Sequence, residues 1–199
     1  MMKLIKYVPN TISLTRIIMC IFFVNGIISQ YNNGQDNTHT LFILFFMICI
    51  SDFLDGKIAR KTNSVSVLGA KLDVFADLFY ITVSYIALVS FKIIPIWFLL
   101  FIIFKFSEFV LTSKFIKNNI KLSDKPFVFD KVGRIVSATF LIIPGIVCIS
   151  KCLNVHYINS IFSCILSMIF IAGMYSSYSR IKDCFKIYKL NNNLERGKL

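Results

Sequence analysis

The sequence predicts an all-α, polytopic membrane protein with six transmembrane helices. Of its 199 residues, 56% are hydrophobic, and the mean hydropathy of +0.72 is typical of membrane proteins rather than soluble ones. Apolar runs of about 20 residues, long enough to cross a bilayer as helices, recur along the chain. They lie near residues 11–30, 38–60, 67–91, 93–114, 132–152 and 157–180. We expect one membrane domain over residues 1–199 and no separate soluble domain.

The distribution of basic residues predicts how these helices are oriented. The net charge is +12, and most Lys and Arg residues fall at the N-terminus, in the 57–66 turn, in the 114–134 loop and in the tail. Positive loops face the cytoplasm, so both termini are expected there, and the basic tail (about 181–199) is expected on the membrane surface. Topology and anionic lipids account for the charge, so we expect no nucleic-acid partner.

The first helix begins at Pro9, a residue suited to a helix start. No small-residue cleavage site follows Met1, so the first apolar run is expected to be a retained helix rather than a signal peptide. Ser13 lies one turn before Arg16 on this helix, and its hydroxyl can donate a hydrogen bond to a phosphate or ribose oxygen. The alternative is a capped helix start with a snorkelling Arg16.

Acidic residues concentrate where the second helix ends and the third begins. Four of the ten acidic residues fall within 52–77. Asp52 and Asp55 are spaced i, i+3, whereas Asp73 and Asp77 are spaced i, i+4, so each pair lies on one helix face. A carboxylate deep in a bilayer costs about 2.5–3.5 kcal/mol, and this cost requires a cationic partner.

Two such faces in contact would bring four carboxylates together. Oxygen ligands suit Mg²⁺, Mn²⁺ or Ca²⁺, and a two-metal site can clamp phosphate oxygens during an in-line displacement. Gly56 and Gly69 are expected where a ligand approaches the backbone closely. The site falls at the cytoplasmic end of both helices, within reach of a water-soluble nucleotide.

Charged residues on the fourth and fifth helices leave alternatives open. Lys105 and Glu108 are spaced i, i+3, so they form either a structural ion pair or part of a ligand pocket. Lys131 and Arg134 belong either to such a pocket or to a basic, cytoplasm-facing flank. The six cysteines are scattered and are expected to act as small apolar residues.

The residues from 52 to 77 carry a family resemblance. The pattern Asp-x2-Asp-Gly-x2-Ala-Arg-x8-Gly-x3-Asp-x3-Asp matches, at every fixed position, the signature of the CDP-alcohol phosphatidyltransferases, which are integral membrane enzymes of phospholipid synthesis. The run from Pro9 to Arg16 is similar to the family's Pro-Asn-x-x-Thr-x-x-Arg, with Ser13 in place of threonine. Heavy use of Ile, Phe, Lys and Asn indicates a bacterial source.

The resemblance implies roles for these residues. Two divalent cations, Mg²⁺ or Mn²⁺, would be bound by Asp52, Asp55, Asp73 and Asp77. Asp77 would also be the catalytic base for the attacking hydroxyl. The CDP group of CDP-diacylglycerol would lie against Ser13, Asp52, Asp55, Gly56, Ala59, Arg60, Gly69 and Asp73. Family membership also implies a homodimer in the cell membrane.

The acceptor alcohol is predicted less directly. The resemblance places an acceptor pocket on helices four and five, where Lys105, Lys131 and Arg134 are the candidates. Several cations favour a phosphorylated acceptor, so glycerol 3-phosphate is expected, with serine and inositol phosphate as alternatives. Leu78 and the residues before it depart from the Asp-Pro-x-Ala-Asp-Lys form of phosphatidylglycerophosphate synthases, which weakens that assignment.

Two other classes of protein compete with this interpretation. A cation transporter would also carry intramembrane carboxylates, but here they cluster at one face, and no matching pair of broken helices is present in the sequence. A structural or assembly protein would have no need of a complete two-metal pattern. Release of CMP from CDP-diacylglycerol separates the three classes.

Overall fold

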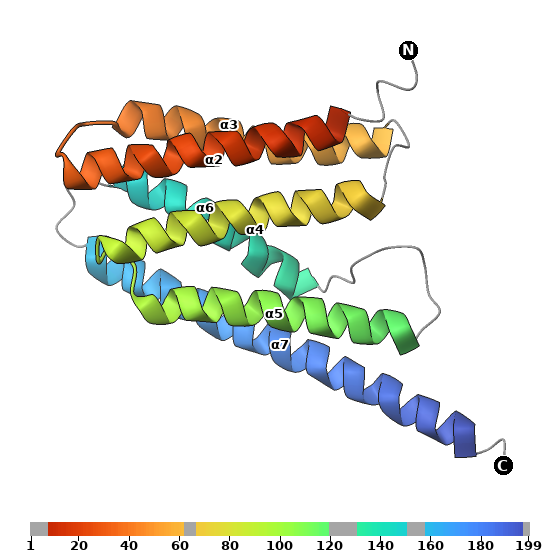
Figure 1. The fold of residues 1–199 in the computed structure, drawn as a ribbon. Helices are drawn as coiled ribbons and strands as arrows, with labels where there is room; N and C mark the ends of the chain where they lie inside the picture. The colour runs from red at the N-terminus through yellow and green to blue at the C-terminus, as the bar shows by residue number, and fades with distance from the viewer. Residues whose placement is uncertain (1–7, 62–66, 120–130, 151–157, 197–199) are drawn as a thin grey trace. The chain divides into compact units, whose positions relative to one another are not determined.

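The computed structural model describes residues 8–61, 67–119, 131–150 and 158–196, and these residues form six α-helices (Figure 1). In chain order the helices are α2 (Val8–Asn32), α3 (Thr38–Lys61), α4 (Val67–Ser90), α5 (Ile96–Asn119), α6 (Lys131–Ser150) and α7 (Ile158–Arg196). No strand occurs within these ranges. The prediction of an all-α chain with six helices is confirmed.

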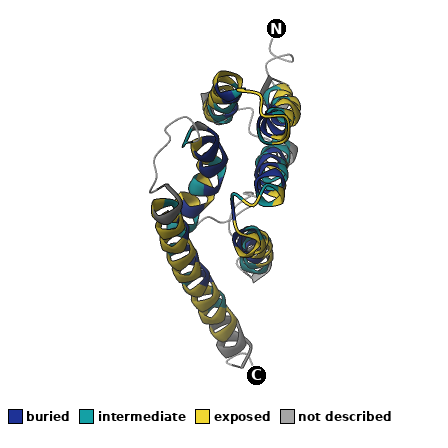
Figure 2. Ribbon diagram, turned by 90° about the vertical axis from the view of Figure 1, so that its left-hand side faces the viewer, coloured by how far each residue is buried: buried dark blue, intermediate teal, exposed yellow. Residues whose placement is uncertain are grey.

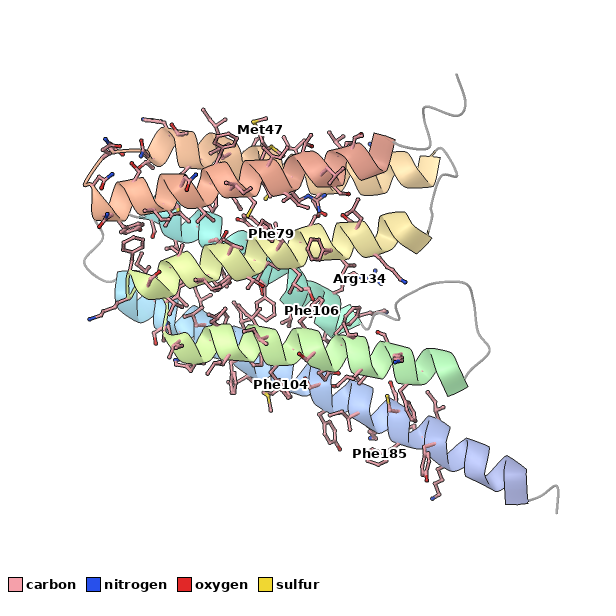
Figure 3. All side chains as sticks on the ribbon, viewed as in Figure 1. Met47, Phe79, Phe104, Phe106, Arg134 and Phe185 are labelled. Carbon is pink, nitrogen blue, oxygen red and sulfur yellow. The ribbon has the colours of Figure 1, made fainter. Side chains whose placement is uncertain are left out.

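Five of the helices are long and apolar enough to cross a membrane. The qualifying segments are Thr11–Asn32, Lys71–Ser90, Ile96–Ile116, Lys131–Cys148 and Ile161–Lys189. The apolar part of α3 is shorter, Thr38–Leu54, because the charged signature residues follow it. Large exposed hydrophobic side chains, including Met47 and Phe185, occur on every described helix, as expected of lipid-facing surfaces (Figure 3). The chain is therefore a multi-pass membrane protein.

One helix, α7, extends well beyond the apolar run that predicted it. The sixth apolar run ends near residue 180, but α7 continues to Arg196. Its extension contains neither Pro nor Gly, so nothing in the local sequence ends the helix. Exposed residues cover much of α7 (Figure 2). The predicted surface tail is thus helical at least as far as Arg196.

The chain divides into two compact units. The first contains Met1–Leu99 and Phe140–Ile158, and the second contains Leu100–Thr139 and Asn159–Leu199. Whether the two act as one membrane domain, as the sequence predicts, stays a prediction. Each unit is described separately below.

In the first unit, α2 packs against both α3 and α4. A Cβ atom at Gly26 would lie 2.8 Å from Leu41 Cδ2, so this glycine lets α3 approach α2 closely. The rings of Phe23 on α2 and Tyr80 on α4 lie 5.7 Å apart between centroids. Asp36 accepts hydrogen bonds from the backbone N–H and the hydroxyl of Thr38, which fixes the start of α3. These contacts set the positions of the three helices that carry the candidate site.

In the second unit, α5 packs against α7. The rings of Phe101 and Phe170 have centroids 4.8 Å apart, and Phe101 fills the space beside Gly173 that a larger residue would occupy. A buried polar cluster lies further along the same two helices. Its members are Lys105, Glu108, Thr112 and Ser113 from α5, with Ser176, Ser177 and Arg180 from α7.

Candidate active site

Three carboxylates from two helices converge in the first unit. Asp52 lies near the end of the apolar part of α3, and Asp73 and Asp77 lie one turn apart on α4. One carboxylate oxygen from each residue lies within 4.8 Å of the other two. The structure therefore brings together three of the four aspartates that the sequence singles out.

A buried arginine from α2 lies at the centre of these carboxylates. Arg16 Nη1 lies 3.2 Å from Asp52 Oδ1, 3.0 Å from Asp73 Oδ1 and 2.5 Å from Asp77 Oδ1. Its Nε donates a hydrogen bond to Ser51 Oγ at 3.3 Å, and Ser51 in turn donates to the Ile48 carbonyl oxygen. Because the Arg16 side chain is fully buried in these contacts, it does not snorkel to the membrane surface, and that alternative is wrong.

The exposure of the four side chains differs in a way that affects ligand binding. The Arg16 side chain has no exposed surface, whereas those of Asp52, Asp73 and Asp77 are 38%, 37% and 30% exposed. The carboxylates are thus open to an incoming ion, whereas the arginine that pairs with them is closed to solvent. Three carboxylates at −1 and one guanidinium at +1 give a formal charge of −2.

The donor set fits a hard divalent cation. Mg²⁺ and Mn²⁺ prefer carboxylate oxygens, and the formal charge of −2 matches that of one such ion. Asp52, Asp73 and Asp77 can together hold a metal ion.

The remaining predicted nucleotide contacts divide into two groups. Ser13 is buried on α2, one turn before Arg16, and Gly69 lies on α4, one turn before Asp73. The backbone of α3 includes Asp55, Gly56, Ala59 and Arg60, but their side-chain surroundings lie outside the described residues. The fourth metal ligand and these CDP contacts therefore stay predictions.

The predicted acceptor residues belong to the second unit. Lys105 is buried, and its Nζ donates to Glu108 Oε2 at 2.9 Å and to Ser177 Oγ at 3.0 Å. Lys131 and Arg134 are exposed in the first turn of α6 (Figure 3). An ion pair between Lys105 and Glu108, one of the two alternatives from the sequence, is present, and binding of an acceptor by these residues stays a prediction.

Sequence reasoning missed two arginines. The buried position of Arg16 between two other helices depends on tertiary packing, which the sequence pattern does not show. Arg180 is also buried, and its Nε lies 3.3 Å from Glu108 Oε1. No spacing in the sequence pairs Arg180 with Glu108, because the two residues lie on different helices and far apart along the chain.

Comparison with known proteins adds evidence independent of this geometry. The family model for CDP-alcohol phosphatidyltransferase matches residues 6–175. The chain belongs to this family. The match includes Arg16 on α2 and the three convergent aspartates on α3 and α4, and it spans residues of both compact units.

Several bacterial relatives within this phosphatidyltransferase family are similar to the chain. A cardiolipin synthase (CMP-forming) from Streptomyces coelicolor is 32% identical over 90 residues, covering 45% of this chain and 42% of the relative. A CDP-diacylglycerol–glycerol-3-phosphate 3-phosphatidyltransferase from Bacillus subtilis is 32% identical over 114 residues, covering 53% and 58%. A CDP-diacylglycerol–serine O-phosphatidyltransferase from the same species is 34% identical over 73 residues, covering 37% and 38%. The chain thus spans about half the length of the relatives it matches.

Proposed function

We propose that this protein transfers the phosphatidyl group of CDP-diacylglycerol to a polar alcohol and releases CMP. The observation that carries the proposal is the convergence of Asp52, Asp73 and Asp77 in a chain of the CDP-alcohol phosphatidyltransferase family. A rival cation transporter would not require this family pattern. The acidic cluster also lies where the apolar part of α3 ends and that of α4 begins, which supports a site at the membrane interface.

The reaction exchanges one phosphate ester for another. The acceptor hydroxyl oxygen forms a bond to the phosphorus that bears diacylglycerol, and the bond from that phosphorus to the oxygen of CMP breaks. Asp77 accepts the hydroxyl proton, and CMP leaves with the bonding electron pair. The lipid tails stay in the bilayer throughout, because the reacting phosphorus is at the interface.

The aspartates would hold the metal ions that this chemistry requires. Asp52, Asp55, Asp73 and Asp77 are the proposed ligands of two Mg²⁺ or Mn²⁺ ions, which would neutralise the pyrophosphate and the charge that develops on CMP. Ser13 and Arg60 would donate hydrogen bonds to phosphate or ribose oxygens. Gly56, Ala59 and Gly69 would leave room for the cytidine.

Glycerol 3-phosphate is the acceptor that we propose. A phosphorylated acceptor approaches a site rich in carboxylates, so it needs fixed cations besides the metals. Lys105, Lys131 and Arg134 on α5 and α6 are the proposed cations, and one Bacillus subtilis relative is named for glycerol 3-phosphate. Serine and inositol phosphate are the alternatives.

Cardiolipin formation is a second candidate function. It is supported by similarity to the Streptomyces coelicolor enzyme and to putative cardiolipin synthases of Mycobacterium that are 39% identical over 93 residues. Cardiolipin carries two phosphatidyl groups on one glycerol, so phosphatidyl transfer with CMP release would use phosphatidylglycerol as the acceptor. For either function, we propose that the protein is a homodimer whose site and two termini lie on the cytoplasmic side of the membrane.

A panel of acceptors tests the proposal. Purified protein in bilayer vesicles would receive CDP-diacylglycerol with glycerol 3-phosphate, serine, inositol phosphate or phosphatidylglycerol, and both CMP and the lipid product would be measured. We expect CMP release with glycerol 3-phosphate and formation of phosphatidylglycerophosphate. Cardiolipin formation would select the second candidate. A folded protein that releases no CMP with any acceptor would exclude the proposed reaction.

A further inference from the structure

We infer that Arg16 is a displaceable internal cation that competes with the divalent metal for Asp52, Asp73 and Asp77. This inference rests on the proposed metal centre and adds a residue that controls its affinity. The alternative is that Arg16 supports metal binding from behind without moving. The two roles predict opposite effects of removing the guanidinium.

The distances show why the two cations compete. A single atom, Arg16 Nη1, is the partner of one oxygen from each aspartate, at 3.2, 3.0 and 2.5 Å. These atoms belong to the three carboxyl groups that would bind the metal ion, and Mg²⁺ needs its ligand oxygens at about 2.0–2.1 Å. A metal ion held between the same oxygens would occupy the space of Nη1. Binding there requires the guanidinium to move.

The exposure and the charge of the cluster favour replacement of the Arg16 guanidinium by a metal ion over a permanent ion pair. The carboxylates are partly exposed, so an ion from solution can reach them, while Arg16 is fully buried. Without a metal, Arg16 offsets the repulsion among three clustered negative charges and keeps them assembled. With a metal, the same positive charge raises the energy of the loaded state. Removing Arg16 should therefore destabilise the metal-free protein and strengthen metal binding.

Ser51 holds the guanidinium in its metal-free position. Its hydroxyl accepts from Arg16 Nε at 3.3 Å and is itself fixed by donation to the Ile48 carbonyl at 2.7 Å. Ser51 is buried on α3 and offers no carboxylate to a metal. Loss of this hydroxyl should loosen Arg16 while leaving all three aspartates in place. Ser51→Ala therefore tests the same role without changing the charge of the site.

Binding of Mn²⁺ to the purified full chain, without substrate, tests the inference directly. Unbound Mn²⁺ is counted by electron paramagnetic resonance across a titration. We expect Arg16→Gln to bind Mn²⁺ about 10-fold more tightly, within the usual range for coupled ligands. Arg16→Lys, which keeps the charge, should stay closer to the unaltered protein, and Ser51→Ala should shift in the same direction as Arg16→Gln by a smaller factor. Lys186→Gln, which removes an exposed cation on α7, is the matched control and should bind as the unaltered chain does.

A thermal unfolding measurement supplies the second readout. In EDTA, Arg16→Gln should unfold at a lower temperature than the unaltered protein. Saturating Mn²⁺ should reduce the difference between the two unfolding temperatures. If Arg16→Gln does not fold, Ser51→Ala decides. Unchanged or weaker Mn²⁺ binding in the folded variants would overturn the competing role of Arg16. That result would leave the proposed metal-dependent release of CMP by the unaltered chain unaffected. Absence of saturable Mn²⁺ binding by the unaltered chain would instead reject the metal centre itself.

Discussion

At the scale of single residues, Asp77 has the most demanding position in the proposed mechanism. It lies closest to Arg16 among the three aspartates, at 2.5 Å from Nη1, and its side chain is 30% exposed. A carboxylate that is both paired and accessible can take part in metal binding and accept a proton from an alcohol. The two roles can be separated by a substitution that keeps the shape and removes the basicity.

Asp77→Asn should lower turnover by about 10²–10⁴-fold, the usual loss when a general base is removed. CDP-diacylglycerol should still bind through the other signature residues. The measurement is the steady-state rate of CMP release together with nucleotide binding at equilibrium. Asp183→Asn, an exposed carboxylate on α7, is the control and should leave the rate unchanged. Near-normal turnover of Asp77→Asn would exclude its role as the base.

The spacing of the aspartates could be interpreted from the sequence, but the position of Arg16 could not. Intervals of three and four residues fix which side chains share a helix face. These intervals predicted that Asp73 and Asp77 point the same way and that Asp52 lies on a matching stripe. Arg16 is 36 positions before Asp52, and only the packing of α2 on α3 and α4 brings its guanidinium among them. Contacts between side chains on three different helices leave no periodic pattern in the sequence.

At the scale of helices, the polar cluster between α5 and α7 is a second place, among the residues that the structure describes, where charge is buried. Glu108 Oε2 accepts from Lys105 Nζ at 2.9 Å and from Ser177 Oγ at 3.1 Å, and Oε1 lies 3.3 Å from Arg180 Nε. The Arg180 Nη2 group also donates to Thr112 Oγ1 and Ser113 Oγ. Glu108 therefore links two cations on different helices, and this fixes how α7 packs on α5.

Glu108→Gln should destabilise the second unit, because it removes the carboxylate that joins the buried Lys105 and Arg180. Breaking a buried pair in this way typically costs about 3–5 kcal/mol. The free energy of unfolding in mixed detergent, followed by loss of helix, is the measurement. Asp183→Asn breaks an exposed i, i+3 pair with Lys186 on α7 and should change stability by no more than about 1 kcal/mol. Equal effects of the two variants would show that the buried cluster has no special structural role.

Helix existence was predictable and helix ends were not. Hydropathy located all six helices, because an apolar run of bilayer length has few alternatives to a helix. The same signal ended α7 near residue 180, whereas the helix continues to Arg196. A hydropathy profile detects where lipid contact stops, and the residues of the extension retain good helix propensity in water.

At the scale of the whole molecule, the sequence and the structure give less evidence for the acceptor alcohol than for any other part of the proposed function. The three candidate cations lie on α5 and α6, in a different compact unit from the aspartates. The named relatives differ from one another in their acceptors. The signature residues are proposed to bind the CDP group that these acceptors share a need for, so they do not distinguish the acceptors, and a kinetic test is needed.

Arg134→Ala should raise the KM for glycerol 3-phosphate by about 10-fold or more, as expected when a charged hydrogen bond is lost. The KM for CDP-diacylglycerol should stay nearly constant, since the residue is not among the predicted nucleotide contacts. Lys182→Ala on α7 provides a control for general loss of positive charge. Equal changes in both KM values would show that Arg134 acts on the site as a whole and not on the acceptor.

We propose that the three convergent aspartates form a metal-dependent phosphatidyl-transfer site. The decisive measurement is the rate of CMP release from CDP-diacylglycerol, in the presence of acceptor, as Mn²⁺ or Mg²⁺ is titrated into EDTA-treated protein. We expect no release without a divalent ion, saturable activation when one is added, and loss of that activation in Asp73→Asn. Release that persists in EDTA, or full activation of Asp73→Asn, would contradict it.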